Sequence, residues 1–188
     1  AKDVFRETVV QYFLDGYERG ETPNPCLMCN RQIRWTFLLN HALALGAEFM
    51  ATGHYVRRKT GDDGQIELLR AVDHSKDQSY VLHVLKQEQL AHALFPVGEY
   101  PKPEIRRIAA DFGLPTASRA DSQDLCFLAG EDYRNFLQRN AAEMLKPGKI
   151  ETAEGKVIGE HNGLANYTIG QRKGLGFASP VPLYVMTK

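Results

Sequence analysis

The stretch that decides the fold class is GAEFMATGHY, residues 46–55. Gly46 closes a helical pattern that begins near Arg31, and Phe49–Thr52 is a short apolar run typical of a buried strand. Gly53 and the two residues after it end that strand. A buried strand directly after a helix is typical of a parallel sheet with helices on its faces. The stretch therefore predicts an αβ unit and an α/β fold.

Helical spacing of apolar residues recurs on both sides of this unit. It predicts further helices over 2–19, 79–84, 86–93, 102–112 and 132–140. One more strand is expected over 66–71. Pro23 and Pro25 predict a stiff, non-helical turn ahead of the helix at Arg31.

The texture of the chain changes after Pro147. Two strand-like runs, 148–152 and 156–159, flank a polar turn, which is the pattern of a short hairpin. We therefore expect two domains. Residues 1–130 complete an open parallel α/β sheet, and 131–188 form a small α+β domain.

The composition excludes several classes of protein. Of the 188 residues 43% are hydrophobic, too many for a disordered chain. The 23 Lys and Arg balance the 23 Asp and Glu, which excludes a uniformly basic nucleic-acid-binding protein but leaves room for a local basic patch. No apolar run approaches the roughly 20 residues needed to cross a bilayer, and the first residues lack a signal-peptide core. The odd number of cysteines argues against a secreted disulfide framework, so we expect a cytoplasmic protein with no membrane partner.

The cysteines are the first residues that could carry chemistry. Cys26 and Cys29 form a CxxC pair, but zinc would require a second pair or histidines at ligand spacing, and a thioredoxin-like site would require a preceding strand. Cys29 is expected near the start of a helix, where the helix dipole and the cations Arg31 and Arg34 favour a thiolate. Cys126 follows an acidic stretch and, taken alone, is typical of a buried structural cysteine.

Six segments, in one order along the chain, together resemble the tRNA-specific 2-thiouridylase family. They are TPNPCLMCN (22–30), ATGHY (51–55), DHSKDQSY (73–80), LFPVG (94–98), DSQDLCF (121–127) and TIGQRKGLG (168–176). The resemblance implies an ATP-pyrophosphatase-type, Rossmann-like sheet domain and ATP-dependent 2-thiolation of uridine 34 of tRNA. In that reaction the C2 oxygen is adenylated and sulfur comes from a cysteine persulfide.

The chain also departs from the family pattern at both ends. The family opens with an SGGVDSS-type loop for the pyrophosphate of ATP, and no such loop precedes residue 20. The family ends with a β-barrel domain, whereas this sequence ends at Lys188. The resemblance therefore implies an internal fragment. Residues 1–130 would be the C-terminal part of the catalytic domain, and 131–188 the central tRNA-binding domain.

The resemblance also implies roles for single residues. Cys29 is expected to be the catalytic nucleophile and Cys126 the carrier of the persulfide. Gly53 matches a position that contacts ATP at a strand end, where α/β sheets place their ligands. The remaining matched positions contact tRNA: Asn24, Pro25 and Cys26 at the target base, and His54, Lys76, Asp77 and Gln78 elsewhere.

The family's reaction implies further molecules. ATP with Mg²⁺ is the expected cofactor, and the expected substrates are tRNAs for glutamate, glutamine and lysine. A cysteine desulfurase or a sulfur-carrier protein would supply the sulfur. The basic run 57–59, together with Arg172 and Lys173, is expected to add to the tRNA-binding surface.

Cys26 leaves the mechanism open, because many family members have Asp at this position. With three thiols, Cys26, Cys29 and Cys126 could instead be ligands of a [4Fe–4S] cluster. In that case the cluster delivers sulfide, whereas an oxidised relay enzyme would show a Cys29–Cys126 disulfide bond. The chain could also be a metal-binding module, or another adenylating enzyme of the ATP-pyrophosphatase superfamily.

Overall fold

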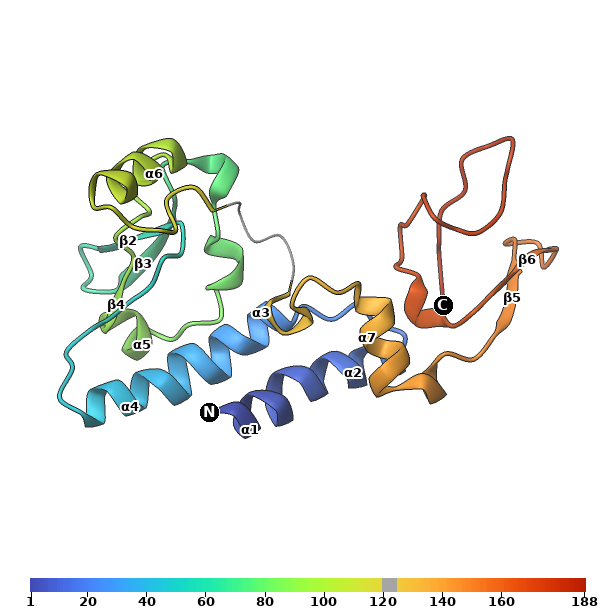
Figure 1. Ribbon diagram of the computed structural model, residues 1–188, viewed down its shortest axis with the longest axis horizontal. Helices are drawn as coiled ribbons and strands as arrows, with labels where there is room; N and C mark the ends of the chain where they lie inside the picture. Colours follow the sequence, from blue (N-terminus) through green and yellow to red (C-terminus); the bar gives the residue numbers. More distant parts are fainter. Residues whose placement is uncertain (120–124) are drawn as a thin grey trace. The chain divides into compact units, whose positions relative to one another are not determined.

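The structure is a computed structural model that describes residues 1–119 and 125–188 (Figure 1). The chain divides into two compact units. The first comprises Ala1–Phe5 and Cys26–Gln123, and the second comprises Arg6–Pro25 and Asp124–Lys188. This division by contacts assigns residues 6–25 to the same unit as the C-terminal part. The boundary near residue 130 stays a prediction about domains.

A long helix begins the main part of the first unit. It runs without interruption through α3 (Pro25–Met28), the π-helical segment η2 (Cys29–Leu38) and α4 (Leu39–Ala44). The turn expected at the two prolines is present up to Asn24, but the expected helix start near Arg31 was wrong, because the helix begins at Pro25. Pro25 is the first helical residue, where its missing N–H costs no hydrogen bond and its fixed φ suits the helix.

Two small sheets follow the helix. β1 (Met50–Ala51) pairs in parallel with β4 (Ala93–Leu94), which confirms the αβ unit expected around residues 46–55. β2 (Val56–Thr60) and β3 (Ile66–Arg70) form an antiparallel hairpin, so the strand predicted over 66–71 is also confirmed. Strand β2 was not predicted. The Arg-Arg-Lys run after Val56 is not typical of a strand, although Val56 itself is fully buried.

One hydrophobic core joins the long helix to these strands. Its buried members are Trp35, Leu39, Val56, Val81, Leu82, Ala93 and Phe95. The Trp35 and Phe95 rings meet edge to face with centroids 5.7 Å apart, a geometry that adds about 1 kcal/mol to the burial itself. The strands of Figure 1 are therefore fixed on the helix by side chains from both.

Short helices complete the first unit. They are η3 (His74–Lys76), η4 (Ser79–Val81), α5 (Gln87–Ala91) and α6 (Lys102–Asp111). The helices expected over 86–93 and 102–112 are thus confirmed, whereas 79–84 forms only one tight turn. Helix α6 has no buried residue, and the Phe112 side chain just beyond it is 77% exposed.

The second unit is built on the N-terminal helix from Arg6 onward and a C-terminal segment. The helix runs through α1 (Lys2–Phe5), η1 (Arg6–Val10) and α2 (Gln11–Glu18), as expected for 2–19. The other elements are η5 (Cys126–Leu128), α7 (Tyr133–Asn140), η6 (Ala142–Met144), β5 (Gly148–Glu151), β6 (Val157–His161) and η7 (Leu164–Asn166). β5 and β6 are antiparallel, which confirms the predicted hairpin.

Aromatic rings form the core of the second unit. Phe13 is buried and meets Phe127 edge to face at 5.2 Å, while Tyr17 stacks on Tyr133 at 5.4 Å. Burial, the largest cause, and the neighbouring Tyr133 raise the pKa of Tyr17 far above its ordinary value. These contacts hold the segment that begins at Cys126 against the N-terminal helix.

Gly98 is the tightest glycine of the first unit and gives a test of this fold. A Cβ at Gly98 would lie 1.8 Å from the carbonyl oxygen of Val56, a backbone atom that cannot move aside cheaply. We expect Gly98→Ala to lower the free energy of unfolding by at least about 3 kcal/mol, the upper end of ordinary overpacking. Chemical denaturation measures this loss. A variant as stable as the wild type would contradict the packing of Gly98 on β2.

Candidate functional site

Three elements of the first unit meet beyond the carboxyl end of β1. Arg34, on the long helix, donates through Nη1 to Nε2 of His54 at 3.0 Å and to Oδ1 of Asn30 at 3.2 Å. Nδ2 of Asn30 donates to the carbonyl oxygen of Val81 at 3.2 Å, and Nδ1 of His54 lies 2.9 Å from Oγ1 of Thr52. The network thus ties the helix to the strand end and to the η4 turn.

His54 is the central and most perturbed group of this network. Its side chain is only 7% exposed. Burial, with a smaller contribution from the Arg34 cation, lowers its pKa to about 4, so the imidazole is neutral at physiological pH. A guanidinium can only donate, so Nε2 must accept and the proton must reside on Nδ1, which donates to Thr52. Both ring nitrogens of His54 are therefore satisfied within the protein.

The cysteine pair lies on the first turns of the long helix. Cys26 is exposed and Cys29 is half-buried, directly before the buried Asn30. Because the helix begins at Pro25, Cys26 rather than Cys29 occupies the first turn, where the helix dipole acts. The expectation that the helix dipole favours a thiolate at Cys29 was therefore wrong. The guanidinium of Arg34 donates hydrogen bonds to Asn30 and His54.

Gly53 lies between Thr52 and His54, whose side chains are joined by a hydrogen bond. It lies two residues beyond β1, which ends at Ala51, and a Cβ built on it would meet nothing within 4 Å. Its backbone is exposed at the carboxyl end of a parallel strand, which is where α/β sheets bind ligands. The open space over Gly53 fits the close approach of a nucleotide.

The 76–78 segment is fastened mainly to its own unit. Oδ1 of Asp77 accepts the backbone N–H of Ala71 at 2.9 Å, and Oδ2 accepts the Ser79 hydroxyl at 2.6 Å. Burial alone would raise the pKa of Asp77, but these hydrogen bonds outweigh it and hold the pKa below its ordinary value. Gln78 accepts the backbone N–H of Tyr55 through Oε1 at 3.0 Å. Lys76 is half-buried.

The second unit contains the other matched positions. Cys126 opens the η5 turn and is exposed, so the interpretation of it as a buried structural cysteine was wrong. Asn24 is half-buried and Pro25 is buried. The Thr22 hydroxyl donates to the Thr168 hydroxyl at 3.1 Å, which joins the TPNP segment to the TIGQRKGLG segment. Residues 121–124 of the DSQDLCF segment lie outside the described residues.

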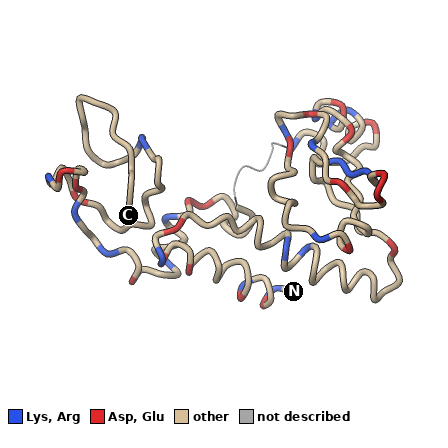
Figure 2. The backbone as a smooth tube through the Cα atoms, turned by 180° about the vertical axis from the view of Figure 1, so that it is seen from behind, with Lys and Arg blue, Asp and Glu red and all other residues tan. Residues whose placement is uncertain are grey.

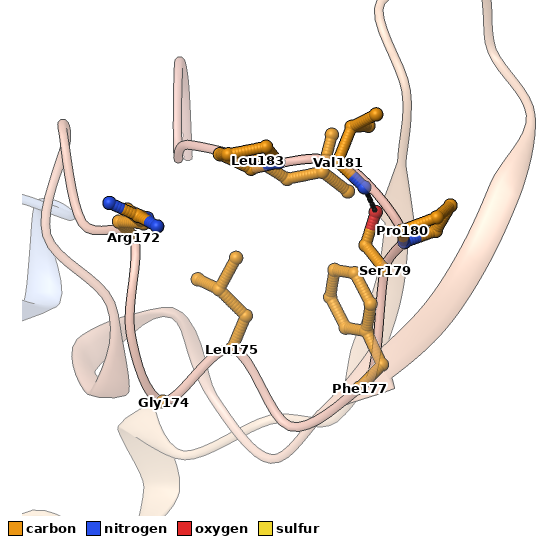
Figure 3. Close-up of a pocket in the computed structure, with 9 residues that line it drawn as sticks. Arg172, Gly174, Leu175, Phe177, Ser179, Pro180, Val181 and Leu183 are labelled. Carbon is orange, nitrogen blue, oxygen red and sulfur yellow. Dashed lines mark hydrogen bonds between the residues drawn. The ribbon is translucent and has the colours of Figure 1, made fainter.

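A pocket of about 360 Å³ lies in this unit, beside the TIGQRKGLG segment (Figure 3). Apolar side chains such as Leu175 and Phe177 line it together with Ser179 and with Arg172, which lies at one side. The loop is closed at its base because the N–H of Gly170 donates to the carbonyl oxygen of Val185 at 2.8 Å.

The basic run 57–59 is engaged within the first unit. Arg57 pairs with Glu99 at 3.6 Å and Lys59 with Glu67 at 2.9 Å, while Arg58 donates to the carbonyl oxygen of Leu90 at 2.6 Å. Figure 2 shows acidic and basic positions interspersed along the chain. The run therefore contributes less uncompensated positive charge than its sequence suggests.

The expected iron–sulfur site would need all three cysteines. Among residues 1–119 and 125–188 no three His, Cys, Asp or Glu side chains are grouped to hold a metal ion. Cys26 and Cys29 belong to one unit and Cys126 to the other, so neither unit alone has the thiolates of a cluster. An iron–sulfur cluster is therefore not shown, and we derive no step through one.

Two other expectations concern bonds and membranes. Within the described part of the chain the three cysteines are thiols, so the expected disulfide bond is not supported. Among those same residues no helix is both long and apolar enough to cross a bilayer.

The structure adds residues that sequence reasoning missed. Asn30 and Thr52 were quoted only as motif letters, and Arg34 only as a nearby cation. The available signal was the i, i+4 spacing of Asn30 and Arg34 on a helix, which places the two side chains together. The partner of Arg34 beyond the strand end, His54, has no such local signature.

Comparison with known proteins gives consistent matches along the chain. A family model described as tRNA methyl transferase HUP domain matches residues 1–130, and one described as tRNA methyl transferase PRC-barrel domain matches residues 134–188. The tRNA-specific 2-thiouridylase MnmA of Moorella thermoacetica is 50% identical over 186 residues, which are 98% of this chain and 52% of that protein. The protein of the same name from Chloroflexus aurantiacus is 50% identical over 182 residues, 97% of this chain and 51% of that protein. The chain thus spans about half the length of the curated relatives it matches.

The neutral His54 predicts a pH dependence of stability. The pKa of His54 is about 4 in the folded protein against 6.5 ordinarily, so between these values the unfolded chain binds a proton that the folded chain does not. Stability should therefore be fully present above pH 6.5 and fall, by about 3 kcal/mol, as the pH approaches 4. Denaturation curves across this window measure the slope. His54→Gln, which keeps an acceptor for Arg34 but cannot titrate, should show a shallower slope, and an unchanged slope would contradict the assignment.

Proposed function

We propose a function from one premise: the chain belongs to the family of the tRNA methyl transferase HUP domain, which matches residues 1–130. The family resemblance and the α/β, Rossmann-like fold class are thereby confirmed. We infer that the protein containing this chain is a tRNA-uridine 2-sulfurtransferase, which thiolates uridine 34 in the anticodon wobble position and consumes ATP. The observation that carries this proposal is 50% identity over 98% of the chain to a protein named tRNA-specific 2-thiouridylase.

ATP is proposed to bind with Mg²⁺ beside Gly53. The open, exposed backbone after β1 supports this, because a phosphate or ribose can approach a glycine more closely than any other residue. The hydrogen bond between Thr52 and His54 holds the residues on either side of Gly53. ATP would convert the C2 oxygen of uridine 34 into a leaving group, with release of pyrophosphate.

Cys29 and Cys126 are proposed to share the sulfur chemistry. Cys126 would carry a persulfide, and its exposure would allow a cysteine desulfurase or sulfur-carrier protein to load it. The thiolate of Cys29 would attack the inner sulfur of that persulfide and release hydrosulfide. The hydrosulfide adds at C2 as AMP leaves, and the two cysteines are left as a disulfide that an external thiol must reduce.

The substrate is proposed to be tRNA for glutamate, glutamine and lysine, with the target base at Asn24, Pro25 and Cys26. Pro25 is buried, and such a preorganised loop loses little entropy when a flipped base binds. For the other proposed tRNA contacts, the hydrogen bonds of Asp77 and Gln78 suggest that these two residues shape the segment that Lys76 belongs to. His54, with both ring nitrogens satisfied, would act through its position in the network.

Gly53→Ala tests the proposed nucleotide site. The backbone of Gly53 is not in the left-handed region and its surroundings are open, so the free energy of unfolding should stay the same or rise by up to about 1 kcal/mol. A methyl group there should nevertheless weaken ATP binding by about tenfold or more, equivalent to about 1.4 kcal/mol. Calorimetric titration of the complete protein with ATP and Mg²⁺ measures the affinity. Unaltered affinity in a stably folded variant would remove Gly53 from the nucleotide site.

The activity and the relay are tested together in a strain that lacks the gene. Mass spectrometry of its tRNA should show no 2-thiouridine at position 34, and the wild-type gene should restore it. Cys29→Ser should fail to restore it, because a serine hydroxyl is a far weaker nucleophile at neutral pH. Cys26→Asp should restore it fully if a persulfide relay operates.

Each outcome of that experiment has a distinct meaning. Unchanged 2-thiouridine in the deletion strain would refute the proposed function. An active Cys29→Ser variant would exclude Cys29 as the nucleophile. An inactive Cys26→Asp variant, together with iron and sulfide in the anaerobically purified wild type, would favour a cluster-dependent mechanism.

A further inference from the structure

We propose that Arg34 is a positioning residue of this site, one that holds the helix turn beside Cys29 and the strand end beside Gly53 in a single arrangement. For its role in catalysis the inference rests on the proposed function. Its geometric part rests on the hydrogen bonds of the first unit alone.

One nitrogen of Arg34 donates to two buried acceptors. Nη1 of Arg34 is 3.2 Å from Oδ1 of Asn30 and 3.0 Å from Nε2 of His54. Both partners are buried, with side chains 1% and 7% exposed, and buried acceptors are costly to leave without a donor. The guanidinium therefore supplies two buried groups on two different elements.

Asn30 lies on the helix turn that carries Cys29. The amide of Asn30 is held at both ends, since Nδ2 donates to the carbonyl oxygen of Val81 while Oδ1 accepts from Arg34. A flipped amide would lose both bonds, so its orientation is fixed. This pair of bonds thus holds Asn30, the residue directly after Cys29, against the η4 turn and Arg34.

His54 connects Arg34 to the residues just beyond β1. With Nε2 accepting from Arg34, the proton of His54 lies on Nδ1 and donates to Oγ1 of Thr52. That bond spans Gly53. Arg34 therefore acts on the proposed nucleotide contact through His54 and on the proposed nucleophile through Asn30.

The test compares three variants of the complete protein. Arg34→Met keeps most of the side-chain length but removes every donor, and Arg34→Lys keeps a donor that can reach one or both acceptors. Arg107→Met is the matched control, because Arg107 lies on the exposed α6 and pairs there with Glu104 and Asp111. Formation of 2-thiouridine is followed with a tRNA transcript, ATP, and a cysteine desulfurase with cysteine as the sulfur source.

We expect Arg34→Met to lower kcat on the order of 100-fold with little change in KM for tRNA, because reacting groups would be misplaced rather than lost. Arg34→Lys should recover most of that loss, and Arg107→Met should behave as the wild type. The imidazole ¹⁵N signals of His54, assigned with His54→Gln, should show the Nδ1–H tautomer in the wild type and a mixture of tautomers in Arg34→Met.

Two results would overturn the proposal. One is an Arg34→Met variant that melts at a lower temperature but keeps its kcat, since a purely structural role predicts that pattern. The other is a wild-type His54 protonated on Nε2. A wild type that forms no 2-thiouridine would refute the proposed function itself, whereas an equally active Arg34→Met would refute only the role of Arg34.

Discussion

The first unit depends on a buried imidazole that has to remain neutral. The side chain of His54 is almost completely buried. A charged ring at this position would lack hydration and would face the Arg34 cation. A neutral ring offers one donor and one acceptor, and the protein supplies a partner for each. Because Nε2 accepts from Arg34 on the helix and Nδ1 donates to Thr52 just beyond β1, the ring links the helix to the end of the strand.

The same principle explains why motif residues need not touch a ligand. Asp77 and Gln78 stand in a segment that resembles a tRNA-contacting motif, yet their side chains accept backbone N–H groups of Ala71 and Tyr55. A backbone donor left unpaired inside a protein costs about as much as a lost hydrogen bond. Their chemistry is therefore required by the fold, whatever the segment around them binds.

The fold could be predicted from sequence wherever the signal was local. Helical spacing marked the N-terminal helix and α6, and the turn between 152 and 156 marked the hairpin, because neighbouring residues determine these elements. The start of the long helix was misjudged, because a proline that breaks a helix interior is favourable at its first position. Strand β2 was missed, because its charged residues are paired with partners far along the chain. The candidate site followed the same division: its motif letters could be read from sequence, but the bond between Arg34 and His54 joins residues that only the fold brings together.

Cys26 shows how far such reasoning reaches for a single substitution. The residue lies in the first turn of a long helix, where exposed N–H groups and the helix dipole favour a negative charge. An aspartate, which the family resemblance implies at this position in many members, would be stabilised there by the helix dipole alone. Cysteine keeps this position small and exposed. Cys29 lies one turn further along the helix, beyond the first turn where the dipole acts, and directly before Asn30, whose amide is held by Arg34 and by the Val81 carbonyl oxygen.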